Sequence, residues 1–450
     1  SYLKKVPPNF EAAKNIYKKG GFSKSYAELT VPATPRDISK GALMFGTSLP
    51  DENNVTKAVA GKAYDNYPAG STTIRFQYKT GDSQDTYSNC KAGGLIGEMM
   101  NPVMAYKYSG HDTDGCLDET KTVLVSFDSD GDRTVLKDVG ATAIKHKNGR
   151  TLQGFSTSAE KKMYVKDVDD GCKGCPYTDF LKFYDYYGSL TYADDWVTAA
   201  LTGNKTEFTR GNIDFTQPIK THDGDAVIAG ALNDAQAIAM RKQTAKKGAA
   251  YMNTWMYVIR EFEDAIDDCD NSCIACNDDP VHAWDEGVAF YTGSLAADTP
   301  NAAGGSLIWA LAEKRCKDYK TCGPNGDSKS LSGTTAKVNN DLLFEFAKGR
   351  DALQAGKCAD VTPITRKVVS LMTIPLAQGT IKYAQKMSSG KMGTKEQGEA
   401  ATFAASVLPM VHACSAADAK IIDDHTKLMD GRTSGGAAQF TDVKAAFERN

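Results

Sequence analysis

The feature that most constrains the fold is a long helical repeat of apolar residues in the second half of the chain. Between residues 226 and 266, large apolar side chains recur at spacings of three and four, the period of an amphipathic helix. The residues in this pattern are Ile228, Leu232, Ile238, Met252, Trp255, Ile259, Phe262 and Ile266. The pattern predicts one helix over this range, with Gly248 as the point where it kinks or breaks and Asp223 or Asp225 as its N-cap.

Later segments continue the helical period. They span residues 280–295, 306–319, 342–356, 364–387 and 396–414. Pro375 and Pro409 fall inside two of these patterns and are expected to kink or end the helices there. The second half therefore predicts a mainly α fold built from helical bundles.

The first half of the chain differs from the second half in its pattern of apolar and polar residues. Residues 11–21 read as a short helix ended by glycine, whereas β-branched and polar residues alternate between Gly/Asp turns from about 70 to 165. We therefore predict an N-terminal α+β domain over 1–222, with a small β elaboration around 70–165, and a C-terminal helical-bundle domain over 223–450.

A weak internal similarity links two helical segments. The spacings Glu286, Phe290, Leu295 and Glu399, Phe403, Leu408 agree. Duplication of a helical unit explains this agreement, and so does chance in alanine-rich helices, so both explanations stay open.

Composition and motifs narrow the function. A chain of 450 residues is long enough for two or three domains, and its net charge of -3 argues against nucleic acid as the main partner. No apolar run is long enough to span a membrane, and the first ten residues lack the hydrophobic core of a signal peptide, so a secreted protein would have lost its signal. The sequence contains no phosphate loop, dinucleotide fingerprint, GxSxG elbow or HExxH helix, and we expect no enzyme.

Cysteine usage indicates an oxidising compartment, periplasmic or secreted. The 11 cysteines are Cys90, Cys116, Cys172, Cys175, Cys269, Cys273, Cys276, Cys316, Cys322, Cys358 and Cys414. Most lie in polar loops, where disulfides are favoured over the zinc sites that the two C-x-x-C pairs also allow. We expect the pairs Cys172–Cys175, Cys316–Cys322, Cys90–Cys116 and Cys358–Cys414, with the odd thiol among Cys269, Cys273 and Cys276. N-glycosylation sequons at Asn54 and Asn204 also favour an exported protein.

The helical segment 280–295 carries the first metal candidates. His282 and Glu286 are four residues apart and project together, opposite an apolar stripe through Trp284. Ala289 and Gly293 share their face, so a neighbouring helix could approach and bury the pair. A buried carboxylate would then need a metal ion or a charged His⁺–Glu⁻ pair to satisfy it. The alternative is an exposed ion pair. Asp285 belongs to the same candidate set.

Other carboxylates extend this set. Glu263 and Asp267 flank the apolar stripe of the long helix, and Glu399 lies on the same side as Phe403, so each is predicted to point inward. Carboxylates and histidine on facing helices are how bundles hold iron. Three neighbours of Glu263 should form a solvated face: Glu261, Asp264 and Asp268.

Two weaker candidates have ordinary structural explanations. Aspartate-rich loops such as 128–132 could bind Ca²⁺, but Arg133 and Val139 stand where a calcium loop needs glycine and glutamate, which favours a polar turn. Tyrosines cluster at 183–192; phenolates can bind ferric iron, although aromatic packing is the commoner explanation.

Five unusual segments resemble the algal iron-assimilating proteins, also called high-carbon-dioxide-inducible periplasmic proteins. They are KNIYKKGGFSKSYAELTV, YADDWVTAALTG, VHAWDEGVAFYTGSL, LMTIPLAQGTIKYAQKM and GEAATFAASVLPMVHAC. The resemblance is scattered over nearly the whole chain and is strongest from about 281 to 415.

This resemblance implies a periplasmic or cell-surface protein that binds iron, Fe³⁺ or Fe²⁺, and assists its uptake. The expected partner is a membrane iron transporter or ferroxidase. No ligand motif transfers from the family. The alternative from another class is a structural or adhesive cell-surface glycoprotein without a specific metal.

Overall fold

The computed structural model divides the chain into two units, residues 15–151 and residues 1–14 with 152–450. Side chains are described for most of residues 2–19, 151–159, 177–220, 235–271, 280–295, 304–331, 334–390, 393–429 and 437–450. Between residues 20 and 150, and at 226–228, only the backbone of the strands named below is described.

The unit 15–151 is built from antiparallel strands. Its four-stranded sheet has the order β5-β4-β1-β9, and β6-β7-β8 form a second sheet beside the short pair β2-β3. The strands are β1 (Ser25–Val31), β2 (Gly46–Thr47), β3 (Ala58–Val59), β4 (Thr72–Tyr78), β5 (Leu95–Met100), β6 (Ala105–Ser109), β7 (Thr122–Ser129), β8 (Asp132–Leu136) and β9 (Ile144–Lys147).

One of the two inner strands of the larger sheet, β1, is a strand that periodicity missed. In β1, Leu29 pairs with Ile74 of β4 on one side and with Ile144 of β9 on the other. The ends of the aspartate-rich run at 128–132 lie in the paired strands β7 and β8, with Ser129 opposite Asp132, whereas Asp130 and Gly131 lie outside the described residues.

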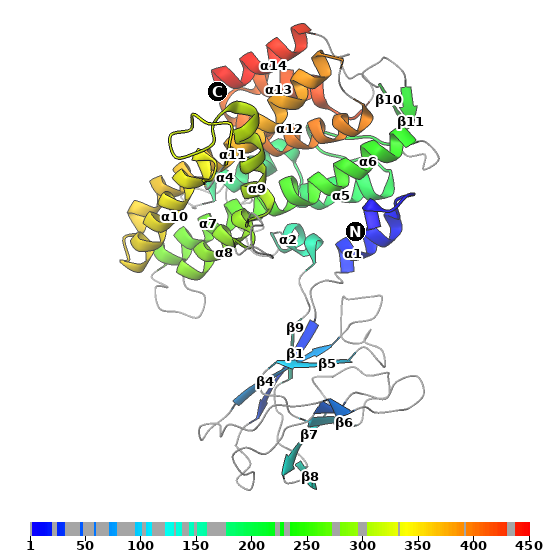
Figure 1. Ribbon diagram of the computed structural model, residues 1–450, viewed down its shortest axis with the longest axis vertical. Coiled ribbons are helices and arrows are strands. Elements are labelled where there is room, and N and C mark those ends of the chain that lie inside the picture. Colours follow the sequence, from blue (N-terminus) through cyan, green and yellow to red (C-terminus); the bar gives the residue numbers. More distant parts are fainter. Residues whose placement is uncertain are drawn as a thin grey trace. The chain divides into compact units, whose positions relative to one another are not determined.

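The other unit is helical, which confirms the mainly α fold with a small β elaboration (Figure 1). Its elements begin with η1 (Tyr2–Lys4) and α1 (Phe10–Lys19), which runs across the unit boundary, and include one hairpin, β10 (Pro218–Lys220) with β11 (Ala226–Ile228). The remaining elements are α2 (Leu152–Ala159), α4 (Thr178–Tyr187), α5 (Tyr192–Thr202), α6 (Ala235–Gly248), η4 (Ala249–Thr254), α7 (Trp255–Asp270), α8 (Pro280–Thr292), α9 (Leu307–Tyr319), α10 (Lys337–Gln354), α11 (Cys358–Ser388), α12 (Thr394–Cys414), α13 (Ala416–Thr426) and α14 (Ala437–Arg449).

The predicted long helix runs continuously from 235 to 270, but begins later than expected because 226–228 is a strand. Regular α geometry ends at Gly248, and the six residues of η4 are π-helical before α7 resumes. Gly248 is required by packing, since a Cβ there would lie 2.8 Å from the Trp196 ring of α5. π-Helical turns occur mostly at functional sites.

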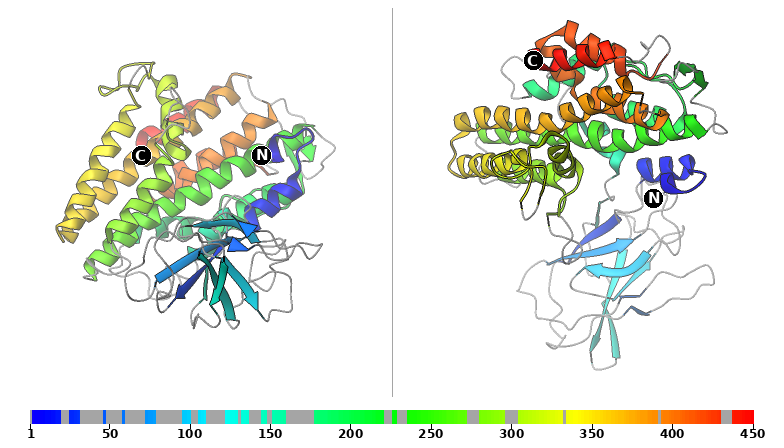
Figure 2. Two further views of the ribbon diagram at one scale, coloured as in Figure 1. Left: turned by 60° about the horizontal axis from the view of Figure 1, so that its bottom comes forward. Right: turned by 45° about the horizontal axis from the view of Figure 1, so that its top comes forward.

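Helices α11 and α12 continue through their internal prolines, so the expected ends at Pro375 and Pro409 are absent. Most of α12 is buried between α6, α11, α13 and α4, and Figure 2 shows the long helices side by side. A helix packed on several sides retains its path because burial offsets the lost backbone hydrogen bond.

Two disulfides are present in the described part of the chain. Cys316–Cys322 was predicted and is confirmed, whereas Cys269 pairs with Cys358 across 89 residues of sequence. The predicted Cys358–Cys414 pair is therefore wrong, and Cys414 is a free, exposed thiol. The other predicted pairs, and Cys273 and Cys276, lie outside the described residues.

The domain boundary lies elsewhere than the sequence suggested. The predicted division falls at 222, whereas the contacts place α2, α4 and α5 with the helical unit and end the strand-rich unit at 151. The reason is that α4 and α5 pack on α12, α7 and α6. No helix among the described residues is long and apolar enough to cross a membrane.

Candidate functional site

The His282–Glu286 pair lies on the surface of α8. His282 Nε2 is 3.6 Å from Glu286 Oε1, and their side chains are 64% and 30% exposed. Ala289 and Asp285 are exposed too, so the face predicted to meet a neighbouring helix faces solvent. The close approach occurs instead at Gly287, where a Cβ would lie 2.9 Å from the Phe262 ring.

Glu263 is buried, as predicted, but its carboxylate caps the N-terminus of α4. It accepts hydrogen bonds from the backbone N–H groups of Asp179 and Phe180, at 2.7 and 3.0 Å. These are N–H groups that a helix leaves unpaired at its N-terminus, so Glu263 caps α4 from a neighbouring helix. Asp267 accepts a hydrogen bond from the Tyr177 hydroxyl at 3.1 Å, and Asp264 accepts one from the same hydroxyl at 3.0 Å.

The solvated face expected on α7 is largely absent. Glu261 is 3% exposed and pairs with the equally buried Arg260 at 2.6 Å, and Arg260 also pairs with Asp264. The expectation was wrong because α4 and α8 both pack on α7, which leaves little of this helix exposed. These charges hold helices together and satisfy one another.

The buried carboxyl group of Glu263, which caps α4, predicts a pH dependence of stability. Burial raises the pKa of Glu263 to about 8, against the two backbone hydrogen bonds, which lower it. A carboxyl group with a raised pKa stabilises the fold fully below its unfolded pKa of about 4.5, and this contribution is lost as pH rises through about 8. Between about pH 5 and about pH 8.5, we expect wild type to lose roughly 4 kcal/mol relative to Glu263→Gln in urea unfolding. A pH-independent difference between the two proteins would contradict this.

Among the predicted ligands, Glu399 is the one that the fold buries beside tyrosine side chains, whose hydroxyl groups could also bind a metal. It is 6% exposed on α12, inward as its spacing from Phe403 predicted. Tyr383 of α11 lies close enough to the Glu399 carboxylate to interact with it electrostatically, and Lys247 of α6 lies 3.7 Å from that carboxylate. Tyr251 of η4 and Tyr383 both stack on Phe403, with ring centroids 5.0 and 5.6 Å away.

Arg315 of α9 completes this group, which we call the Glu399 cluster: Lys247, Tyr251, Arg315, Tyr383, Glu399 and Phe403. Arg315 is 7% exposed, and its Nε lies 3.1 Å from Asp318. The cluster joins α6, η4, α9, α11 and α12, whose contacts bring together residues from 247 to 403. Close approach of α11 to α12 is fixed by Gly379, where a Cβ would meet the Phe403 ring at 2.9 Å.

Burial opposes charge on the side chains of the cluster, and the neighbouring charges modify its effect. Burial lowers the pKa of Lys247, which Glu399 opposes, and the nearby cations Lys246, Lys314 and Arg315 lower it further. Burial raises the pKa of Tyr251 to about 12, and Arg315 opposes this rise. The pKa of Tyr383 is also raised, by burial and then by the nearby Glu399 carboxylate, and Arg315 opposes this rise too.

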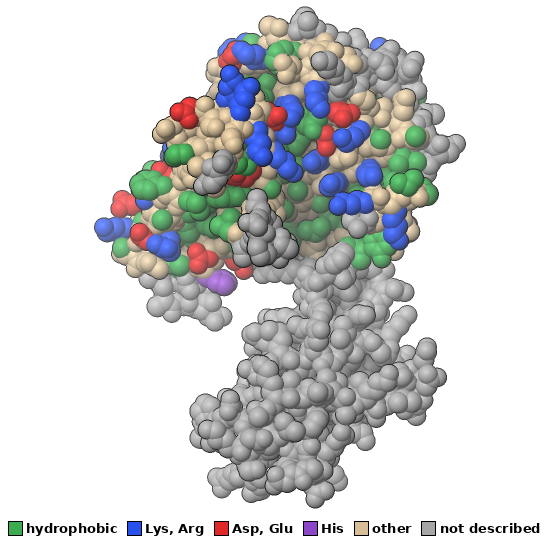
Figure 3. All heavy atoms as spheres, viewed as in Figure 1, with side chains coloured by type: hydrophobic (Ala, Val, Ile, Leu, Met, Phe, Trp, Pro, Cys, Tyr) green, Lys and Arg blue, Asp and Glu red, His purple; other side chains and the backbone are tan. Residues whose placement is uncertain are grey.

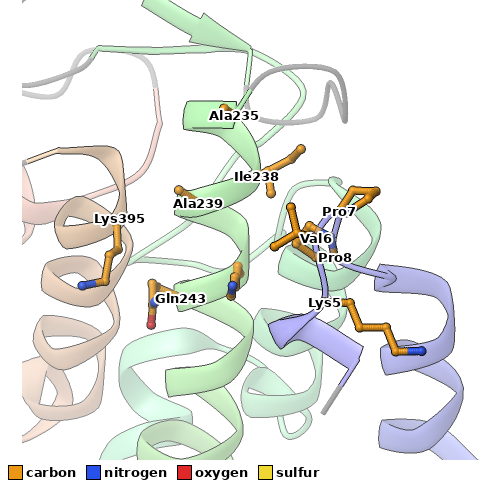
Figure 4. Close-up of a pocket in the computed structure, with 10 residues that line it drawn as sticks. Lys5, Val6, Pro7, Pro8, Ala235, Ile238, Ala239, Gln243 and Lys395 are labelled. Atoms are coloured by element: carbon orange, nitrogen blue, oxygen red, sulfur yellow. The ribbon is translucent and has the colours of Figure 1, made fainter.

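Two hollows in the helical unit lie apart from this cluster. One, of about 390 Å³, lies between residues 5–8 and the start of α6 and is shown in Figure 4, where Val6 and Pro8 face Ile238 while the Lys5 ammonium points away. A larger groove of about 700 Å³ runs along α11 and α12 past Cys414. Neither joins the candidate ligands.

The remaining predicted positions have structural explanations or lie outside the described residues. Within the tyrosine cluster, Tyr187 stacks on Tyr192 at 4.6 Å and its hydroxyl donates to the Ala405 carbonyl, which is aromatic packing as expected. In the Asn204 sequon, Asn204 is exposed and Thr206 is buried, and Asn54 is not described. Within the described residues, no group of three or more His, Cys, Asp and Glu side chains could hold a metal ion.

Sequence reasoning found Glu399 and missed its partners. Lys247 and Tyr251 stand four apart across Gly248, the expected break, and this was the one local signal that both belong to a site. Arg315 and Tyr383 come from other helices and have no such signal. Searches for similar family models, curated proteins and solved structures gave no match.

Proposed function

We propose that this chain is an extracytoplasmic iron-binding protein that assists iron uptake, and that its ferric ion binds at the Glu399 cluster. The observation that carries the proposal is the stacking of Tyr251 and Tyr383 on the same Phe403 ring, beside the buried Glu399 carboxylate with which both tyrosines interact electrostatically. The resemblance to algal iron-assimilating proteins supports iron as the cargo.

The donor chemistry suits ferric iron. Phenolate and carboxylate oxygens are hard, anionic ligands, and tyrosine is an established ligand of protein-bound iron. Tyrosine must lose its proton to bind. Burial raises the pKa of Tyr251 and Tyr383 and so opposes this loss, whereas the nearby Arg315 cation acts in the opposite direction and assists it. Iron binding should therefore release protons and strengthen as pH rises.

The surface pair His282–Glu286 is a weaker candidate. It offers two ligands at 3.6 Å from each other, and both side chains have room to hydrate. Its use as a ligand pair stays a prediction, and the experiment below separates it from the Glu399 cluster.

The cysteines support the proposed compartment. Disulfides persist in oxidising environments, and Cys269–Cys358 and Cys316–Cys322 fit one. A periplasmic or cell-surface protein there meets iron in its ferric form and passes it to a membrane transporter or ferroxidase.

Ferric loading followed by desalting tests the proposal. We expect wild type to retain one iron per chain and to show a visible tyrosinate-to-iron charge-transfer band. Tyr383→Phe and Glu399→Gln should lose both. Tyr319→Phe is the matched control, because the Tyr319 hydroxyl is also buried near Arg315 but donates to the Gln378 carbonyl.

The double variant His282→Ala, Glu286→Ala should keep the iron and the band. If that double variant loses its iron and Tyr383→Phe retains it, the iron site lies on α8 and not at the Glu399 cluster. A wild-type protein that retains no iron would remove the function and favour the structural glycoprotein.

A further inference from the structure

Arg315 is a buried cation with an unused hydrogen-bond donor. Its side chain is more than nine-tenths buried, and Nη1 has no hydrogen-bond partner among the described residues. The one carboxylate that pairs with its Nε, Asp318, is shared with Lys382, which binds both Asp318 oxygens at 2.8 Å. A buried guanidinium with a free donor is costly unless a ligand satisfies it.

The surroundings of Arg315 carry a surplus of positive charge. Lys247 interacts electrostatically with Arg315, Lys246 and Lys314, whereas the carboxylates near the cluster are Glu399, Glu396 and Asp318. Figure 3 shows lysine and arginine side chains gathered on this face, over α9, α12 and α6. Lys247 is 20% exposed, so solvent reaches the edge of the cluster.

We propose that Arg315 and Lys247 form a binding site for a small oxyanion, a carboxylate or a phosphate. Arg315 Nη1 and the Lys247 ammonium donate to the anion, and the Tyr251 hydroxyl, which is protonated at neutral pH, lies nearby as a neutral donor. Guanidinium N–H groups match the geometry of oxygen anions, so the site discriminates against chloride. This inference goes beyond iron binding and holds for iron-free protein.

Thermal unfolding of chelator-treated, iron-free protein tests the site. Sodium phosphate and sodium acetate are titrated separately against sodium chloride at equal ionic strength. We expect one of the two oxyanions to raise the Tm of wild type in a saturable manner, and the arm that responds identifies phosphate or carboxylate. Arg315→Gln should weaken this anion dependence at least tenfold, whereas Arg366→Gln, an exposed arginine on α11, should not change it.

Lys247→Gln keeps Arg315 and should also weaken the anion dependence, so this variant carries the test if Arg315→Gln does not fold. Equal responses to chloride and to both oxyanions in wild type would overturn the proposal. So would an unchanged response in Arg315→Gln and Lys247→Gln. Because iron is absent throughout, these outcomes are independent of the ferric site.

Discussion

Replacing Cys269 and Cys358 together by alanine should lower the free energy of unfolding by roughly 4–5 kcal/mol. The disulfide closes a loop with a sequence separation of 89 residues and joins the end of α7 to the start of α11. Without it, the unfolded chain gains the entropy of a long open loop, and that gain grows with the logarithm of loop length. Urea unfolding of the purified variant measures the change.

The second disulfide is the matched control. Cys316 and Cys322 are separated by six residues, so replacing both should cost only about 2 kcal/mol by the same reasoning. Equal losses in the two double variants would contradict an effect governed by loop length.

Gly349→Ala should destabilise the protein by about 3 kcal/mol, although alanine is the better helix former. A Cβ at this position of α10 would lie 2.0 Å from the Trp284 ring of α8. The indole cannot yield, because it is fully buried, its Nε1 donates to the Phe346 carbonyl at 3.0 Å, and its ring meets Phe262.

A double-mutant cycle separates steric conflict from other effects. Trp284→Phe shortens the ring and should relieve the clash, so Gly349→Ala should cost at least about 1 kcal/mol less in that background. Additive losses in the cycle would show that the two helices do not depend on this contact.

Local periodicity predicted many elements of this fold and missed others. Apolar spacing predicted a long helical run with a kink or break at Gly248, where regular α geometry does end, and alternation predicted β4, β7, β8 and β9. It missed β1, and it could not show that α7 is covered on several sides, because the number of neighbours of a helix is set by tertiary packing. For this reason Glu261 and Arg260 are buried where a solvated face was expected.

The candidate site was harder to predict for a similar reason. His282 and Glu286 share one helix, so their spacing was visible, but nothing local showed that their face meets solvent. Likewise, nothing in the sequence around Cys358 indicates that it forms a disulfide with Cys269, because the two cysteines are distant in sequence. Glu399 was predicted to point inward, whereas Tyr383, Arg315 and the others reach it only through the packing of five elements.

Iron-edge anomalous scattering from crystals grown with ferric-loaded protein tests the central claim most directly. The account predicts one strong peak within coordination distance of the Glu399 carboxylate and the Tyr383 hydroxyl oxygen. A peak at His282 and Glu286, or no peak in crystals that contain stoichiometric iron in solution, would contradict it.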